Sequence, residues 1–368
     1  MRAVGKTFAR ENNKKLVLSL IYHNSPVSRT QIVKLSNLSK VTVTRVVNDL
    51  MRDGLIFEAD HVASNGGRPQ VPLSLIANSR FAIGVDVGVS EIRIGICDLL
   101  GNVLKSSEKV IEPKVSGTEL VNMITGSLKE LIAGSGINRN KFLGIGISMP
   151  GVIDTEKGAV TSSFVLKGSN IELKKHIEAA VKLDTMLDRD ANAGLFYEMF
   201  SGCGVGIDDI LYVYTRNNEK GELGIGCSFL LGGRIYRGTE YFAGEIGLAG
   251  GENGSDLFSF NEAISLLNVI EAAKAGDAGA REALLSVSRK LGKTMAFIVN
   301  LLNPALVIIG GDFAAAGQMF LDPVEVAMRE KMFEFSTKNI KIRPSSVTEE
   351  AGIKAAAFMV VAKMLGYK

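Results

Sequence analysis

The stretch FLGIGISMPGVID, residues 142–154, decides the fold class expected for most of this chain. It begins with a run of apolar residues and glycines that is typical of a buried strand, and it continues into a Pro-Gly turn. Glycine-rich turns allow the backbone to approach phosphate groups closely, although each one alone is more often only a turn. FAIGVDVGVS at 81–90 and ALVIIGG at 305–311 have a similar composition. Together these stretches predict an α/β architecture.

Around this stretch the chain repeats one order of elements twice. Each half has three consecutive strands, then a helical segment, then a buried strand. This duplication predicts two similar lobes with a cleft between them, where ligands usually bind. We place the first lobe at residues 79–195 together with a C-terminal helix at 352–368, and the second lobe at residues 196–351. The expected strands are 81–89, 91–99, 102–110 and 142–149 in the first half, and 209–216, 222–233, 234–241 and 305–311 in the second.

Residues 1–78 are predicted to form a separate, smaller domain. Apolar residues recur at helical spacing in NKKLVLSLIYH (13–23). Ser28 and Gln31 match a capping box for a second helix, and Ser39 is the expected N-cap of a third helix that stops at Gly54. Two strands follow, LIFEADHV and PLSLIA, joined by the Gly-rich tip ASNGGRPQ. This order indicates a winged helix-turn-helix, an α+β fold.

The third helix has an apolar stripe and a polar face, and the polar face suits DNA. Lys and Arg can contact phosphates or guanine, Asn can pair with adenine, and an Arg on the wing can enter the minor groove. Double-stranded operator DNA is therefore the expected partner. The alternative is a small helical domain with a polar surface and no nucleic-acid role. The stripe is Val43, Val46, Val47 and Leu50, and the candidate DNA-binding residues are Lys40, Thr42, Thr44, Arg45, Asn48 and, on the wing, Arg68.

The distribution of charge supports a polyanion partner for the head. Residues 1–80 contain 12 Lys and Arg against 5 Asp and Glu, whereas the rest of the chain contains 30 against 34. A basic head on a mildly acidic body suggests that only the head meets nucleic acid. The alternative is an ordinary solvated basic face.

Composition also points to a cytoplasmic protein without a membrane partner. No apolar run reaches the roughly 20 residues that a membrane helix needs. The N-terminal residues lack the apolar segment of a secretory signal. The 3 cysteines are scattered along the chain, which argues against a disulfide framework.

The order and spacing of the glycine-rich and acidic stretches resemble those of the ROK family of repressors, open reading frames and kinases. The resemblance covers about residues 10–365, and it implies an α/β two-lobe ATPase fold like that of actin and hexokinase. The winged helix-turn-helix places the chain in the repressor branch, similar to xylose and N-acetylglucosamine repressors. The matching stretches are DVGVS (86–90), GIGISMPGVID (144–154), DRDANA (188–193), GIG (224–226), AGEIG (243–247) and GG (310–311).

The resemblance implies roles for individual residues. Asp190 would bind sugar and, in an active kinase, act as the catalytic base. Glu245 and Glu262 would hydrogen-bond sugar hydroxyls, and Asn170 is a further candidate. The alternative for these carboxylates is a helix cap or an ordinary surface position. Mg-ATP is the expected cofactor only if kinase activity is retained, and the nucleotide contacts would then come from Asp86, Gly88, Ser90, Gly224, Gly226, Gly310 and Gly311.

Several positions depart from the kinases of the family. Leu223 replaces a Thr whose hydroxyl would contact a phosphate, and Val89 adds bulk in the first phosphate loop. Leu248 replaces a sugar-binding His that often helps to hold zinc, and the zinc cysteines are absent, so neither zinc nor another metal site is expected. Arg189 replaces an Asn, and it either reshapes the pocket or pairs with Asp190 and lowers the pKa of that carboxyl. Phosphate binding should therefore be damaged more than sugar binding.

Three functions are compatible with this pattern. The leading hypothesis is a non-enzymatic, sugar-responsive repressor of carbohydrate-utilisation genes. Sugar in the cleft would change the angle between the lobes, and hence the spacing of the DNA-binding heads in a homodimer or tetramer. The alternative is an ATP-dependent sugar kinase with N-acetylglucosamine or glucose as substrate. A third hypothesis is a bifunctional protein, or a regulator that binds nucleotide without turnover.

Overall fold

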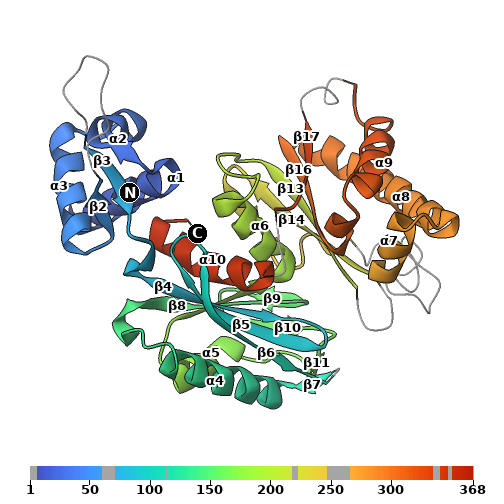
Figure 1. Cartoon of the computed structure of the whole chain (residues 1–368), viewed down its shortest axis with the longest axis horizontal. Helices are drawn as coiled ribbons and strands as arrows, with labels where there is room; N and C mark the ends of the chain where they lie inside the picture. Colours follow the sequence, from blue (N-terminus) through green and yellow to red (C-terminus); the bar gives the residue numbers. More distant parts are fainter. Residues whose placement is uncertain are drawn as a thin grey trace.

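The computed structural model describes residues 6–59, 71–112, 114–217, 223–246, 266–334, 340–346 and 350–367. Figure 1 shows a small N-terminal head and two larger lobes, each built on one mixed sheet. Two helices, α6 (Asp190–Ser201) and α10 (Ala351–Leu365), pack against each other between the lobes. None of the described helices combines the length and the apolar character that crossing a membrane would require.

The head is the predicted winged helix-turn-helix. It contains α1 (Lys6–Asn24), α2 (Arg29–Ser36) and α3 (Lys40–Arg52), with β1 (Val27–Ser28), β2 (Ile56–Glu58) and β3 (Pro72–Leu75) in a sheet of order β1-β3-β2. Ser28 and Gln31 form the predicted capping box, and the Ser39 side chain caps α3. The sequence did not indicate β1, because two residues are too few to show a period. Arg68 and the wing tip lie outside the described residues.

Lobe 1 is built on a five-stranded sheet of order β12-β8-β4-β5-β6. β8 is parallel to both β4 and β12, whereas β5 is antiparallel to its two neighbours. α4 (Gly117–Ala133) and α5 (Leu173–Val181) cover one face, and α10 covers the other. The strands are β4 Phe81–Val87, β5 Glu91–Asp98, β6 Val103–Val110, β8 Phe142–Met149 and β12 Thr185–Arg189; the short strands β7 Val115–Ser116, β9 Val152–Asp154, β10 Ala159–Ser162 and β11 Leu166–Lys167 pair separately.

Lobe 2 repeats this connectivity in a sheet of order β15-β14-β13-β16-β17. Here β13 pairs antiparallel with β14 and parallel with β16, just as β4 pairs with β5 and β8. α7 (Leu266–Lys274), α8 (Ala278–Leu302) and α9 (Gln318–Arg329) cover the outer face, and α6 covers the inner face. The two-lobe fold and the duplication expected from the sequence are therefore confirmed. The strands are β13 Ile210–Asn217, β14 Leu223–Leu231, β15 Arg234–Tyr236, β16 Leu306–Gly311 and β17 Lys341–Pro344.

The helix α10 returns from the end of the chain to lie directly on the sheet of lobe 1. Gly84 on β4 and Gly146 on β8 make this close approach possible. A Cβ atom at Gly84 would lie 1.9 Å from the Ile353 carbonyl oxygen, and one at Gly146 would lie 1.8 Å from that of Ala356. The domain boundaries expected from the sequence, 1–78, 79–195 with 352–368, and 196–351, stay a prediction.

Candidate functional site

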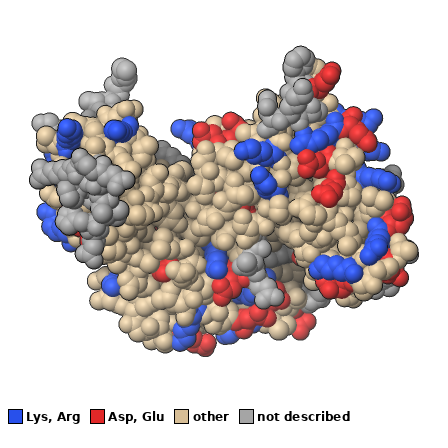
Figure 2. Space-filling model, turned by 45° about the horizontal axis from the view of Figure 1, so that its top comes forward, with Lys and Arg blue, Asp and Glu red and all other residues tan. Residues whose placement is uncertain are grey.

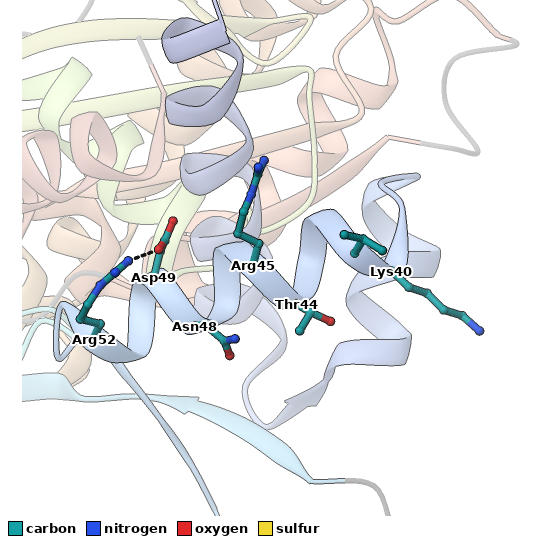
Figure 3. A pocket seen from close by; sticks show the side chains of 7 residues that line it. Lys40, Thr44, Arg45, Asn48, Asp49 and Arg52 are labelled. Carbon is teal, nitrogen blue, oxygen red and sulfur yellow. Dashed lines mark hydrogen bonds and ion pairs between the residues drawn. The ribbon is translucent and has the colours of Figure 1, made fainter.

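The first candidate site is the exposed face of α3. Val43, Val46, Val47 and Leu50 are buried in the core of the head, as the apolar stripe predicts. The opposite face carries polar side chains that extend away from the helix, with Thr44 and Asn48 on one side and Arg45 on another (Figure 3). The exposed residues of this face are Lys40, Val41, Thr44, Arg45, Asn48 and Arg52.

Three details of α3 were not evident from the sequence. The Thr42 hydroxyl lies 2.9 Å from that of Ser39, so this side chain takes part in the cap. Val41 is 79% exposed, and it offers a methyl surface of the kind that contacts thymine. Asp49 adds a carboxylate to the face, and the neighbouring Arg10 and Arg52 hold the pKa of that carboxyl below its usual value. Because both arginines pair with Asp49, the face keeps its positive character.

The charge of the head differs from that of lobe 2 on the surface shown in Figure 2. There the head presents Lys and Arg with few carboxylates, whereas lobe 2 presents both signs in mixture. Arg10 in α1 donates to Asp49 at 2.7 Å, and Lys14 donates to Asp53 at 2.5 Å. These two bonds attach the N-terminal helix to the C-terminal end of α3 and fix its orientation in the head.

The second candidate site lies at the carboxyl ends of the parallel strands β4, β8 and β12 of lobe 1, which lie side by side. Asp86 on β4 and Asp188 on β12 flank Ser148 on β8 in the register of the sheet. Asp86 is buried, accepts from the Ser148 hydroxyl at 3.1 Å, and lies 3.3 Å from the Arg93 guanidinium. A Cβ atom at Gly352, in the first turn of α10, would lie 2.2 Å from the same carboxylate.

These contacts bear on the nucleotide role expected for Asp86. A magnesium ion needs free carboxylate oxygens, and it is repelled by a neighbouring cation. Asp86 instead faces Arg93 on one side and the first turn of α10 on the other. The residues present therefore do not fit a nucleotide-bound magnesium ion at this carboxylate. The sequence did not draw attention to Arg93, which alternates with apolar residues along β5.

The glycines expected at a nucleotide lie at strand ends and turns of both lobes. Gly88 donates its N–H to the Glu91 carbonyl in the tight turn between β4 and β5, a turn that also contains Ser90. Gly310 and Gly311 end β16, and a Cβ atom at Gly311 would lie 1.7 Å from the Thr215 carbonyl oxygen. Gly224 and Gly226 lie on β14, paired with Arg216 and Tyr214 of β13. Glycine is thus required at position 311 by backbone packing alone.

The sugar-binding carboxylates expected from the sequence lie at the start of α6 and in the segment after β15. Asp190 is the first residue of α6, where the positive end of the helix dipole stabilises a carboxylate. The preceding Arg189 is buried, forms an ion pair with Glu245, and donates to the Cys227 carbonyl at 2.6 Å. Burial raises the pKa of Glu245, and Arg189 opposes that shift. The sequence named Glu245 as a sugar-binding candidate but did not indicate that it pairs with Arg189.

A network of charged and polar side chains surrounds these carboxylates and joins the lobes. Asp188 accepts from Arg237 at 2.6 and 3.0 Å and from Asn192 at 2.7 Å. Asn192 in turn accepts from the Ser228 hydroxyl on β14 at 2.6 Å. We call Asp188, Arg189, Asn192, Ser228, Arg237 and Glu245 the interlobe network. The sequence pointed to Arg189, Glu245 and the stretch 188–193, but it did not indicate Ser228, Arg237 or the pairing of these side chains.

The remaining candidates lie elsewhere. Asn170 is exposed on the loop before α5, has a φ of 56°, and donates its N–H to the Thr161 carbonyl at 3.2 Å. Glu262 and Leu248 lie outside the described residues. Within the described part of the chain, no group of three or more His, Cys, Asp or Glu side chains could hold a metal ion.

The chain is similar to known proteins along its whole length. A xylose repressor of Caldicellulosiruptor bescii is 28% identical, with 98% of each chain aligned. A crystal structure of a ROK family transcriptional regulator, a homologue of the Escherichia coli MLC protein, has a TM-score of 0.81 with 97% of each chain covered and 22% identity. A ROK glucokinase from Streptomyces griseus, solved with glucose and AMPPNP, has a TM-score of 0.64 and 21% identity over 76% of this chain and 98% of its own.

The family model gives the same result from the sequence. The model of the ROK family matches residues 82–250 and 257–363, which include both lobes and α10. The two structural neighbours share the fold, and the family match covers most of the chain. This chain therefore belongs to the ROK family.

Proposed function

We propose that this protein is a sugar-responsive transcriptional regulator that represses carbohydrate-utilisation genes. The observation that carries the proposal is the alignment of 98% of this chain with 98% of a xylose repressor, in which the winged helix-turn-helix is included. The head supplies a DNA-binding surface, and the cleft supplies carboxylates suited to sugar hydroxyls.

DNA binding is assigned to α3 and the wing. Lys40 and Arg45 would contact phosphates or guanine, Asn48 would pair with adenine, and Thr44 would contact a base edge. Thr42 and Arg68 complete the proposed set. A head of this kind contacts one half-site, so we expect a homodimer or tetramer, which light scattering would measure.

Sugar binding is assigned to Asp190 and Glu245, with Glu262 and Asn170 as further members. An ionised carboxylate accepts hydrogen bonds only, and sugar hydroxyls donate them. The ion pair with Arg189 favours the ionised form of Glu245 against the effect of burial. Arg189 would thus keep Glu245 ionised and able to accept a hydrogen bond from a sugar hydroxyl.

The cleft is a sensor in this proposal and carries out no phosphoryl transfer. Arg93 lies at the carboxylate of Asp86 that would otherwise face magnesium. Phosphoryl transfer relies on the positioning of metal and phosphate, so the loss of this site should abolish turnover while sugar binding persists. A coupled assay with ATP and D-xylose, D-glucose or N-acetylglucosamine should remain at background. Turnover that disappears on Asp190→Ala would contradict the proposal.

A gel shift with the DNA upstream of its own gene tests the regulatory function. Binding should be strong at low salt and should weaken steeply as salt rises, because phosphate contacts release counterions. D-xylose, D-glucose and N-acetylglucosamine are then added in separate experiments. One of these sugars should change the affinity of the protein for the DNA. If no complex forms at low salt, the proposed function is wrong.

A further inference from the structure

The helices α6 and α10 both extend from the end of the lobe 1 sheet that carries Asp86 and Asp188 to the head. They pack against each other, and each begins at one of the two carboxylates discussed above (Figure 1). α6 starts at Asp190, immediately after Asp188 and Arg189 of the interlobe network. α10 starts against Asp86, where Gly352 touches the carboxylate. α6 contacts β13 and β14 of lobe 2 as well as α10, so a change in the angle between the lobes would act on α6 and, through it, on α10.

The opposite ends of the same helices meet the head at one cluster of rings. The His23 ring of α1 stacks on Phe200 of α6, with ring centroids 5.7 Å apart and an angle of 25° between the planes. Tyr367, just after α10, meets Phe200 edge-on at 4.8 Å, and Phe358 of α10 stacks on Phe200 at 6.1 Å. With Tyr22 of α1, which meets Phe200 edge-on at 6.2 Å, these residues form what we call the aromatic joint.

Polar contacts of Tyr367 also link the end of α10 to α1. The Tyr367 hydroxyl lies 3.4 Å from His23 Nε2 and 3.3 Å from the Ser19 hydroxyl. Both partners are on α1, so a single oxygen at the end of the chain links α10 to two successive turns of the first helix. Hydroxyl contacts depend on angle and distance, and they would change when α10 tilts relative to α1.

The head is also joined to the body by a continuous apolar core. Its buried residues Val17, Ile21 and Leu50 belong to the same cluster as Phe196 and Phe200 of α6 and the apolar residues of α10. Beside this contact, a pocket of about 430 Å³ opens between the head and lobe 1, with Lys14, Asp53, Arg80 and Lys363 among its lining residues. The head is thus packed against the helices on one side, and the pocket leaves space beside it on the other.

We propose that α6 and α10 form a connector that transmits sugar binding in the cleft to the DNA-binding head through the aromatic joint. The proposal rests on the function proposed above. A helix rises about 1.5 Å per residue, so the 12 residues of α6 span roughly 18 Å as one rigid element. Coupling requires that sugar favours one orientation of the head, and DNA then changes sugar affinity by the same factor. The alternative is that the short linker 76–80 transmits the change.

The test compares DNA affinity with and without sugar in matched variants. Fluorescence anisotropy on the upstream DNA gives the ratio of the two dissociation constants, with D-xylose, D-glucose and N-acetylglucosamine as probes. His23→Ala removes a ring of the aromatic joint, and His176→Ala, on the exposed face of α5, is its control. Tyr367→Phe removes one oxygen without removing a ring, and Tyr236→Phe on the exposed strand β15 is its control.

The expected result is a loss of coupling without a loss of binding. In His23→Ala the ratio should fall about 2- to 30-fold towards one, whereas both controls keep the wild-type ratio. Calorimetry should show that the variant still binds sugar without DNA. A merely structural role would instead lower melting temperature and both affinities together. Tyr367→Phe should show a smaller fall with an unchanged melting temperature.

The outcomes separate this inference from the proposed function. If none of the sugars changes the DNA affinity of the wild-type protein, the proposed function is wrong and this inference with it. If the wild type responds and both variants of the aromatic joint keep the full ratio, the inference alone is wrong. Hydrogen exchange in α1 that does not change on sugar binding would also contradict it.

Discussion

The exposed face of α3 and the carboxyl ends of the parallel strands in lobe 1 use charged residues in opposite ways. On α3, Lys40 and Arg45 extend into solvent. At these strand ends, Asp86, Asp188 and Arg189 are buried, and each is bonded to partners within the protein. Charges left at the surface are available to a polyanion from outside, whereas buried pairs fix the arrangement of the elements that carry them. The difference fits the proposed roles, an external DNA partner for the head and a sugar-dependent arrangement of the lobes.

The largest effect should come from breaking a buried pair of the interlobe network. Asp188→Ala would leave Arg237 without its carboxylate, and losing one partner of a buried ion pair costs about 3–5 kcal/mol of unfolding free energy. Urea denaturation followed by circular dichroism measures this loss. Glu172→Ala, which breaks the exposed pair with Lys175, is the control and should leave the curve unchanged. Equal curves for the two variants would show that the network does not hold the lobes.

A smaller effect, on DNA affinity, is expected from a substitution on the exposed face of α3. Arg45→Ala should weaken binding to the upstream DNA by about 1–3 kcal/mol and leave thermal stability unchanged, because this side chain is solvated in the free protein. Anisotropy at two salt concentrations gives both the affinity and its salt dependence. Lys290→Ala on the exposed side of α8 removes the same charge far from the head and should have no effect on either. Equal losses in both variants would mean that DNA binding depends on net charge alone.

A third change separates sugar binding from DNA binding. Asp190→Asn keeps one acceptor oxygen but loses the charge, so the dissociation constant for sugar should rise about fivefold to tenfold, or about 1–1.5 kcal/mol. Isothermal titration calorimetry with the sugar found active on DNA checks this. DNA affinity without sugar should match that of the wild type. An altered DNA affinity together with normal sugar binding would remove Asp190 from the sugar site.

The smallest effect is the pH dependence of stability that His23 of the aromatic joint contributes. Burial lowers the pKa of His23 below 6.5, so the unfolded chain takes up its proton first as pH falls. Stability is therefore fully present above pH 6.5 and declines as pH falls from 6.5 towards the lower pKa of the folded state. Thermal melts across this window should show a decline that is reduced in His23→Phe. An equal decline in both proteins would assign it to other groups.

The sequence was sufficient for features set by neighbouring residues. The capping box at Ser28, the cap at Ser39 and the apolar stripe of α3 depend on spacings of three and four residues, which a single segment displays. The duplicated sheets were evident for the same reason, because each strand has its own pattern of apolar residues and glycine. The wing residue Arg68 and the candidate Glu262 stay predictions.

The ion pairs of the interlobe network could not be predicted from such local spacings. Arg189 and Glu245 are 56 residues apart, and Asp188 and Arg237 are 49 apart. No local pattern encodes such distances, because the pairs form only when the two lobes meet. Arg93 was missed for a related reason. On an isolated strand it is an ordinary polar residue, and only the pairing of β4 with β5 places it opposite Asp86.

The return of α10 to the first sheet has a consequence for biosynthesis. A ribosome adds about 5–20 residues per second and lets domains fold as they emerge. The head is complete early, but the sheet of lobe 1 exposes Gly84 and Gly146 until residues 351–365 arrive to cover them. A nascent or prematurely terminated chain would thus carry a DNA-binding head that no sugar can control. Pulse proteolysis of chains shortened before residue 351 would show a first lobe that is more labile than in the full chain.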